Sequence, residues 1–223
     1  VLRSMISYNP YEALNDDRPA KMAEVKSEID EKLEMEEARR RFVQTAKGLY
    51  HEQLNRGFIS TADAFSELIK AEDIALDEAH TPMDQYDVHL KESVETPVGT
   101  RCLNLLMKGP FRFIAMYILR HHIKTAYEIL SNFIYVHEHV ISELKTLKSH
   151  EGVLGNKEAL QLSYENKRTL DEAYSDLKEY ETMFPEIVKD LAAKTAARVL
   201  LEHERSMTLE EYEEGEIMAN EMK

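Results

Sequence analysis

The chain has 223 residues, and 43% of them are apolar, which is enough to fill a hydrophobic core. Its 7 glycines and 6 prolines are too few for the turns of a many-stranded β fold. The formal net charge of −14 argues against nucleic acid as a partner, because binding to phosphates requires clustered Lys and Arg. We therefore predict an all-α protein, a multi-helix bundle with long antiparallel helices and a helical hairpin.

Cysteine usage and hydropathy indicate the compartment. Cys102 is the only cysteine, so the chain forms no internal disulfide, which agrees with a reducing compartment. There is no signal-peptide pattern, and no run of 18 residues lacks charge, so we expect no membrane span. Because the chain starts at Val1 without Met, we expect it to be a piece of a longer or processed protein.

A helical hairpin is predicted in the first third of the chain. A helix is expected over residues 23–55, with an exposed, charged first half and a buried second half. Gly57 supplies a glycine C-cap, and the sequence from Ser60 to Asp63 resembles a capping box. The return helix is expected over residues 61–78.

An irregular segment, residues 83–97, follows the hairpin and mixes Asp, Glu, His and Pro with few periodic apolar residues. We predict that it is a linker between two lobes. The first lobe is a helical hairpin, residues 1–82, and the second is a long-helix bundle, residues 98–223. A short apolar helix over residues 98–108 opens the second lobe.

The longest predicted helix covers residues 111–148. Gly109 and Pro110 precede it, and Pro fits the first helical turn because its missing N–H would be unpaired there. Its apolar residues recur at helical spacing and are expected to form one buried stripe. This stripe comprises Ile114, Tyr117, Ile118, Ile123, Tyr127, Leu130, Phe133, Ile134, His137, Val140, Ile141, Leu144 and Leu147.

Three further helices are expected near the C-terminus. The first covers residues 157–181 and ends at the pair Phe184-Pro185, and the second covers residues 187–204. Ala192, Ala193, Ala196 and Ala197 would allow a partner helix to approach the second one closely. Residues 208–211 form a second capping-box pattern that would open a last, acidic helix.

Candidate catalytic and metal-binding patterns fail on their spacing. No glycine-rich phosphate loop is present. His137 and His139 point about 200° apart on a helix, unlike the i and i+4 pair that binds zinc, so His137 is interpreted as a core histidine. Cys102 has no neighbouring base in the sequence and is interpreted as a small buried hydrophobe. We predict no enzymatic activity, no cofactor and no metal.

One basic segment lies within this acidic chain. Between Thr96 and Tyr127 there is no Asp or Glu. Arg120, Lys124 and Glu128 lie at steps of four and are expected to form a solvated ridge with an ion pair. The basic segment either pairs with acidic neighbours or contacts an anionic membrane or a charged domain. The candidate contact residues are Arg101, Lys108, Arg112, Arg120, His121, His122 and Lys124.

Two stretches resemble a known family. The first is residues 41–60, RFVQTAKGLYHEQLNRGFIS, followed by Ala-Leu-Asp at 75–77, and the second is residues 180–203, with its Phe-Pro, Lys-Thr and Leu-Glu-His elements. Both are similar to the cytosolic region of Na+/H+ exchangers of the plant salt-overly-sensitive and sperm-specific types. Residues 120–131 between them also fit this family.

This resemblance implies a helical, non-catalytic regulatory and dimerisation domain of a sodium/proton antiporter, lying on the cytoplasmic side of the membrane. The partners that it implies are the transmembrane exchanger domain of the same polypeptide, a second copy in a homodimer, and a downstream cyclic-nucleotide-binding-like domain. No transport residue is carried over, because those residues belong to the membrane domain. The alternative function is a free-standing acidic helical scaffold or adaptor unrelated to transport.

Overall fold

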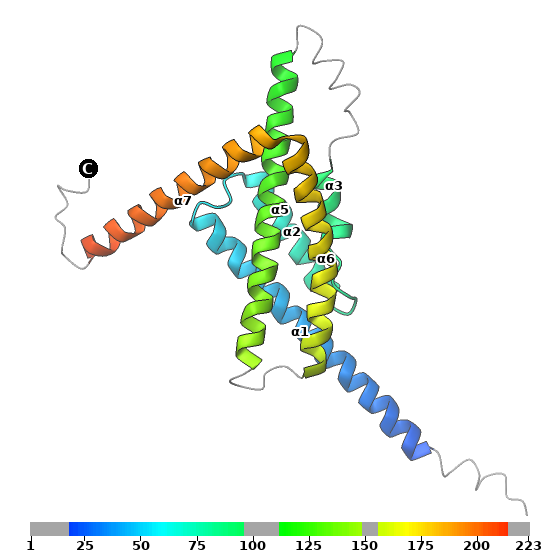
Figure 1. Ribbon diagram of the computed structural model, residues 1–223. Helices are drawn as coiled ribbons and strands as arrows, with labels where there is room; N and C mark the ends of the chain where they lie inside the picture. Colours follow the sequence, from blue (N-terminus) through cyan, green and yellow to red (C-terminus); the bar gives the residue numbers. More distant parts are fainter. Residues whose placement is uncertain (1–17, 96–111, 149–155, 214–223) are drawn as a thin grey trace, which may run out of the picture.

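The computed structural model describes residues 18–95, 112–148 and 156–213, and this part of the chain contains helices and no strands (Figure 1). The predicted all-α bundle is therefore confirmed. Its elements are α1 (Arg18–Asn55), α2 (Ala62–Asp77), the π-helical turn η1 (Tyr86–Leu90), α3 (Lys91–Val94), α5 (Arg112–Lys148), α6 (Asn156–Met183) and α7 (Pro185–Glu213). No described helix combines the length and apolar character that a bilayer span requires.

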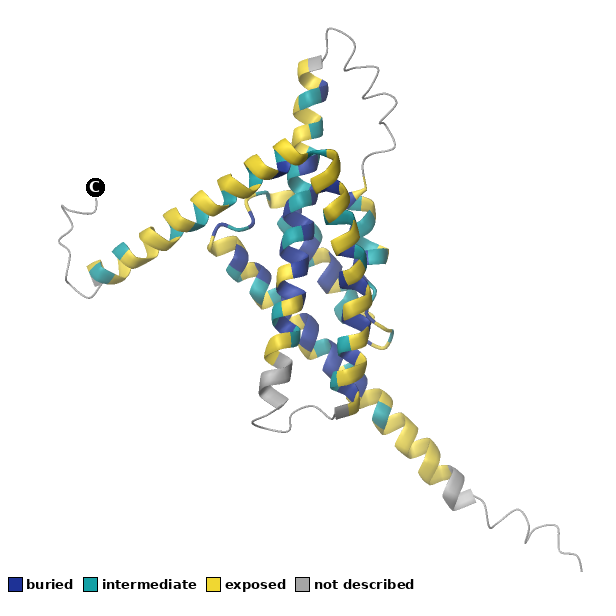
Figure 2. Cartoon of the chain, viewed as in Figure 1, coloured by how far each residue is buried: buried dark blue, intermediate teal, exposed yellow. Residues whose placement is uncertain are grey.

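The hairpin of α1 and α2 packs against the pair α5 and α6, which run side by side (Figure 1). Gly57 turns the chain between the hairpin arms with a φ of 79°, a left-handed conformation that glycine adopts without steric cost. The second half of α1 is buried and its first half is exposed, as the charge pattern predicted (Figure 2). The largest fully buried side chains include Phe42, Tyr50, Phe133 and Leu162.

The expectation of an irregular segment over residues 83–97 is wrong for most of its length. Met83, Tyr86, Leu90 and Val94 lie at three- and four-residue steps, and all four side chains join the core. Burial of these side chains outweighs the weak helical propensity of the polar residues between them. The residues of both predicted lobes thus contribute to one shared hydrophobic core in the described part of the chain.

The last helices also differ from the prediction. The break at Phe184 between α6 and α7 is confirmed, but α7 continues to Glu213. The Thr208 hydroxyl donates to the Glu204 carbonyl at 2.8 Å, within the helix, so Thr208 is not a cap. Ala192, Ala193, Ala196 and Ala197 of α7 are exposed, so the described helices do not bury them. Figure 2 shows α7 leaving the bundle after its first turns with most residues exposed.

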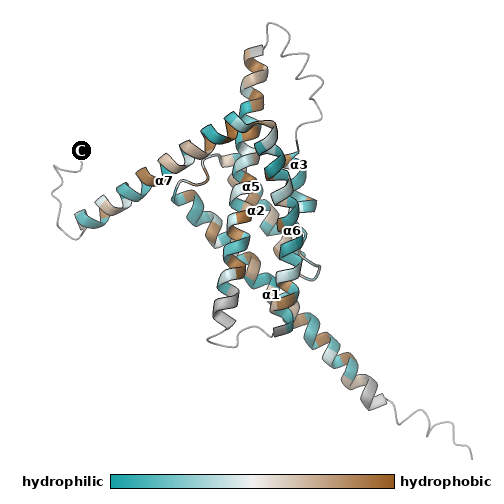
Figure 3. Cartoon of the chain, viewed as in Figure 1, coloured by the Kyte–Doolittle hydropathy of each residue, from teal (hydrophilic) through white to brown (hydrophobic). Residues whose placement is uncertain are grey.

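The predicted buried stripe of α5 is correct only from Ile123 onward. Ile114, Tyr117 and Ile118 are exposed, because the first turns of α5 extend beyond the ends of its neighbours (Figures 1 and 2). Figure 3 shows apolar residues in these projecting turns. The predictions for residues 98–108, for Cys102 and for Gly109-Pro110 lie outside the described residues, as do the side chains of Leu144 and Leu147.

Candidate functional site

The predicted basic residues fall into three groups. Arg101, Lys108 and the side chain of Arg112 lie outside the part of the chain that the structure describes. Arg120 and His121 are exposed on α5, and no ion pair involving Arg120 is found within the described residues. His122 and Lys124 are half-buried and make contacts inside the bundle.

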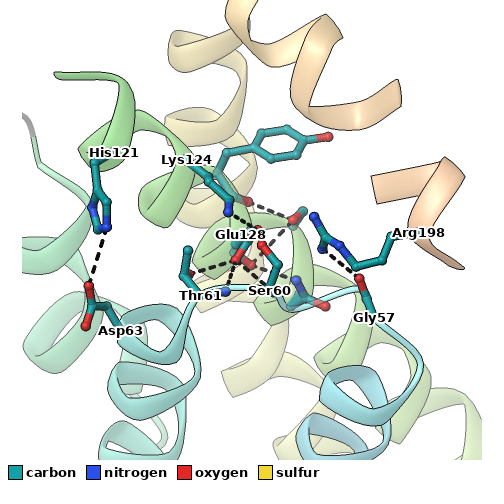
Figure 4. Close-up of polar contacts among 11 residues, drawn as sticks. Gly57, Ser60, Thr61, Asp63, His121, Lys124, Glu128 and Arg198 are labelled. Carbon is teal, nitrogen blue, oxygen red and sulfur yellow. Dashed lines mark hydrogen bonds and ion pairs between the residues drawn. The ribbon is translucent and has the colours of Figure 1, made fainter. Parts of the chain in front are cut away.

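His121 and Lys124 pair with acidic side chains at the start of α2 and within α5 (Figure 4). His121 Nε2 lies 3.9 Å from Asp63 Oδ2, and Lys124 Nζ lies 3.9 Å from Glu128 Oε1. For these two residues the structure agrees with pairing to acidic neighbours. Both pairs have long separations, and the first is exposed, so each contributes little to stability.

His122 does not belong to an exposed basic surface. Its Nε2 lies 3.2 Å from the Tyr180 hydroxyl, which itself donates to the Val94 carbonyl at 2.5 Å. Burial lowers the pKa of His122 from its ordinary value, with the backbone of Val94 acting in the opposite direction and the charge of His121 acting in the same direction. His122 therefore positions α5 against α3 and α6 and adds little positive charge.

Glu128 is the centre of the polar network at this end of the bundle (Figure 4). Its side chain is only 4% exposed, so the expectation of a solvated ridge at this position is wrong. The backbone N–H groups of Ser60 and Thr61 donate to Glu128 Oε2 at 3.1 and 2.9 Å. Their hydroxyls donate to its carboxylate oxygens at 2.5 and 2.7 Å.

Glu128 accepts the hydrogen bonds at the start of α2 that the sequence predicted a local capping box would make. Thr61 is the N-cap of α2, but its side chain makes no capping bond to the helix. The N–H and hydroxyl donors of Ser60 and Thr61, directly before the first turn of α2, are instead satisfied by a carboxylate from another helix. A negative charge is favourable at a helix N-terminus. This exchange fixes the position of α5 relative to the α1–α2 loop.

Arg198 of α7 holds the same loop from the opposite side (Figure 4). Its Nη1 donates to the Gly57 carbonyl at 2.8 Å. The Arg198 side chain passes so close to Gly57 that a Cβ there would lie 3.1 Å from its Cγ and Cδ. We call the set Glu128, Arg198 and loop residues 57–61 the loop clamp, since α5 and α7 grip one loop.

An open groove of about 660 Å³ lies beside the loop clamp. Phe58 from the loop and Val199 and Leu209 from α7 supply its apolar lining, and charged side chains of α1 and α7 surround it. The ring of Phe58 stacks on Tyr135 of α5, with 6.3 Å between ring centroids. The groove therefore connects the same elements that meet at the loop clamp.

His137 lies away from this site, and its interpretation as a hydrogen-bonded core histidine is confirmed. The side chain is fully buried, with Nδ1 at 2.7 Å from Asn166 Oδ1 and Nε2 at 3.1 Å from Glu72 Oε1. In the described part of the chain, no group of three or more His, Cys, Asp or Glu side chains is placed to hold a metal ion.

Sequence reasoning missed Ser60, Thr61 and Arg198 as members of a shared site. The first two carried a signal, since their sequence resembles a capping box, but the acceptor lies 67 and 68 positions away. Arg198 carried no local signal. Comparison with known proteins adds no assignment, because no family model matches the chain and no curated protein matches it.

Proposed function

We propose that the chain is a non-catalytic regulatory and dimerisation module of a sodium/proton antiporter, on the cytoplasmic side of the membrane. Two points support the proposal: the resemblance of residues 41–60 and 180–203 to the cytosolic region of such exchangers, and the all-helical fold. The module would couple signals from a downstream domain to the transmembrane exchanger domain of the same polypeptide.

The observation that carries the proposal is the loop clamp. Gly57 and Ser60 belong to the first family-like stretch, and Arg198 belongs to the second. The segment 120–131, which also fits the family, contains Glu128. The three segments that carry the resemblance therefore meet through hydrogen bonds, as a coupling element requires.

A physical route for the coupling follows from these contacts. α7 leads toward the downstream part of the chain, and α5 presents its projecting first turns at the same end of the bundle (Figure 1). A displacement of α7 would move Arg198 and the loop, and the loop is bonded to Glu128 on α5. Coupling of this kind transmits a change between two arrangements of packed elements.

Two experiments test the proposal. The reading frame upstream of Val1 should encode about a dozen hydrophobic spans of about 20 residues each. In the intact transporter, Arg198→Gln should leave maximal exchange in place but change the response to the activating signal about five-fold or more. Arg168→Gln, an exposed arginine on α6, is the matched control and should change neither quantity.

Absence of hydrophobic spans upstream would refute the antiporter assignment. It would leave the second candidate, a free-standing acidic helical scaffold, which the first half of α1 supports because Met22, Val25, Ile29 and Leu33 are exposed there at helical spacing. The same apolar stripe supports a homodimer under either function. Sedimentation or light scattering on the chain measures the oligomeric state, and a strict monomer would remove dimerisation from the proposal.

A further inference from the structure

The projecting end of α5 exposes an unusual set of apolar side chains. Phe113 is 86% exposed, Tyr117 71%, Ile114 58% and Ile118 47%. At about 100° per residue they span an arc of about 140° on one side of the helix. Isolated exposed apolar residues are ordinary, but four that share one helix end form a patch that indicates an interaction site.

Basic residues follow this patch along the same helix. Arg120, His121 and Lys124 begin two residues after Ile118 and lie on the same side of the helix, where Arg120 and His121 are exposed and Lys124 is half-buried. With a rise of 1.5 Å per residue, the apolar part is about 8 Å long and the basic part continues for about 6 Å more. Interfacial helices bury their apolar residues about 5–10 Å deep, with Lys and Arg at the level of the headgroups.

We propose that the projecting end of α5 inserts into an anionic lipid surface, with Phe113, Ile114, Tyr117 and Ile118 among the acyl chains and Arg120 at the phosphate headgroups. The inference deepens the proposed function, on which it rests for the presence of a membrane beside the module. Tyr117 suits this depth, because tyrosine places an apolar ring and a polar hydroxyl at a membrane interface.

Charge selects the lipid and the orientation. Residues 112–127, which include the projecting end of α5 and the basic residues after it, contain no Asp or Glu. The whole chain, in contrast, has a net charge of −14. Anionic headgroups attract the end of α5 and repel the acidic remainder of the bundle. The molecule would therefore meet the surface with α5 first and the acidic bundle away from it.

The order of residues along α5 favours lipid over a protein partner. A helix that docks in a protein groove presents apolar residues at i, i+3, i+4 and i+7, over about two turns of its length. In α5 the exposed apolar residues are confined to positions 113–118, which is too short for such a face, and the exposed residues that follow them toward the bundle, Arg120 and His121, are basic. Arg112 precedes the apolar residues in the sequence. A second copy docking its acidic α1 on this end is the competing occupant, and the experiment separates the two.

The chain contains no Trp, so a single introduced Trp reports on one position without background. We expect Phe113→Trp to give a blue-shifted emission with vesicles containing about one-third phosphatidylserine, and quenching by brominated acyl chains. Leu200→Trp is the matched control, since Leu200 is 63% exposed on α7, and its emission should not change. Vesicles of phosphatidylcholine alone should give little shift at either position.

Two variants, one single and one double, test the charged and the apolar contributions separately in co-sedimentation with the same vesicles. Arg120→Gln should weaken binding about five-fold, and the combination Phe113→Ser with Tyr117→Ser should weaken it about ten-fold or more. Arg168→Gln and Leu200→Ser are the controls and should bind like the original chain. Unchanged circular dichroism shows that the variants remain folded.

Several results would overturn the inference: an unshifted Phe113→Trp emission, equal binding to neutral and anionic vesicles, or equal losses in the control variants. Association of two chains that disappears with Phe113→Ser and Tyr117→Ser, without vesicle binding, would identify a second copy as the occupant instead. Vesicle binding is measured on the chain by itself, so hydrophobic spans missing upstream of Val1 would refute the antiporter assignment without removing a positive vesicle result.

Discussion

Replacing Glu128 by Ala removes the acceptor of four hydrogen bonds that hold the start of α2. Ser60 is exposed, so water can replace its two bonds, whereas Thr61 is half-buried and its two donors lose their partner. A hydrogen bond to a charged group contributes about 1.5–3 kcal/mol. We therefore expect Glu128→Ala to lower the free energy of unfolding by about 3–6 kcal/mol.

Glu128→Gln provides the finer comparison, because the amide keeps one acceptor oxygen and turns an NH2 group toward donors. It should lower the free energy of unfolding by about half as much as the alanine variant. Urea unfolding followed by circular dichroism measures both values. Thr61→Val combined with Glu128→Ala completes a double-mutant cycle in which the two losses should be strongly non-additive. Additive losses, or a loss below about 1 kcal/mol for Glu128→Ala, would refute the assignment of Glu128 as the cap of α2.

Two other features give stability predictions by the same assay. Gly57→Ala should destabilise the fold by about 1–2 kcal/mol, because its φ is positive and its Cβ would press on Arg198. Gly48→Ala, the matched control inside α1 with open space around it, should stabilise by about 0.5–1 kcal/mol. Opposite signs are the expected result, and equal effects would contradict the conformational argument. Burial raises the pKa of the Glu165 carboxyl, but Arg39 Nε and Nη2, which donate to it at 3.0 and 2.7 Å, together with two other donors, lower it overall. This ion pair should therefore stabilise the fold above the ordinary glutamate pKa of about 4.3 and lose that contribution as the pH falls below it. Arg39→Met should remove this acid dependence of the urea midpoint. A variant whose midpoint falls between about pH 6 and pH 3 as much as that of the original chain would contradict the prediction.

The long helices could be predicted from the sequence because each has a continuous apolar period and a recognisable end. The expected helix 61–78 is observed as Ala62–Asp77, and the expected helix 157–181 as Asn156–Met183. The segment 86–94 could not be predicted in this way. Its turns are short and polar, and they become helical only where other helices bury Tyr86 and Leu90.

Periodicity also shows which face of a helix is apolar but not how far a neighbour covers it. In α5 the apolar positions from Ile114 to Ile118 follow the same pattern as Ile123 and Leu130, yet the first are exposed and the others are buried. The difference arises from where the adjacent helices end. The sequence therefore placed Ile114, Tyr117 and Ile118 in the core, although all three are exposed.

In the candidate site, sequence spacing likewise predicts contacts within one helix but not contacts between helices. Lys124 and Glu128 are four residues apart, which predicts an exposed ion pair on one helix. Their nitrogen and oxygen atoms are 3.9 Å apart, while Ser60 and Thr61 lie within hydrogen-bond distance of the carboxylate. A local rule thus found a real neighbour and missed the stronger partners, because those come from a different helix.

The two sides of the loop clamp have different physical consequences. Glu128 is buried and accepts hydrogen bonds from the backbone N–H groups of Ser60 and Thr61 directly before α2, so its removal should destabilise the hairpin. Arg198 is half-buried and lies beyond the turns of α7 that reach the core through Ile187 and Leu191. Losing its bond to Gly57 should alter the direction of α7 while leaving the core packed. Arg198 is therefore the position at which signal transmission can be separated from folding.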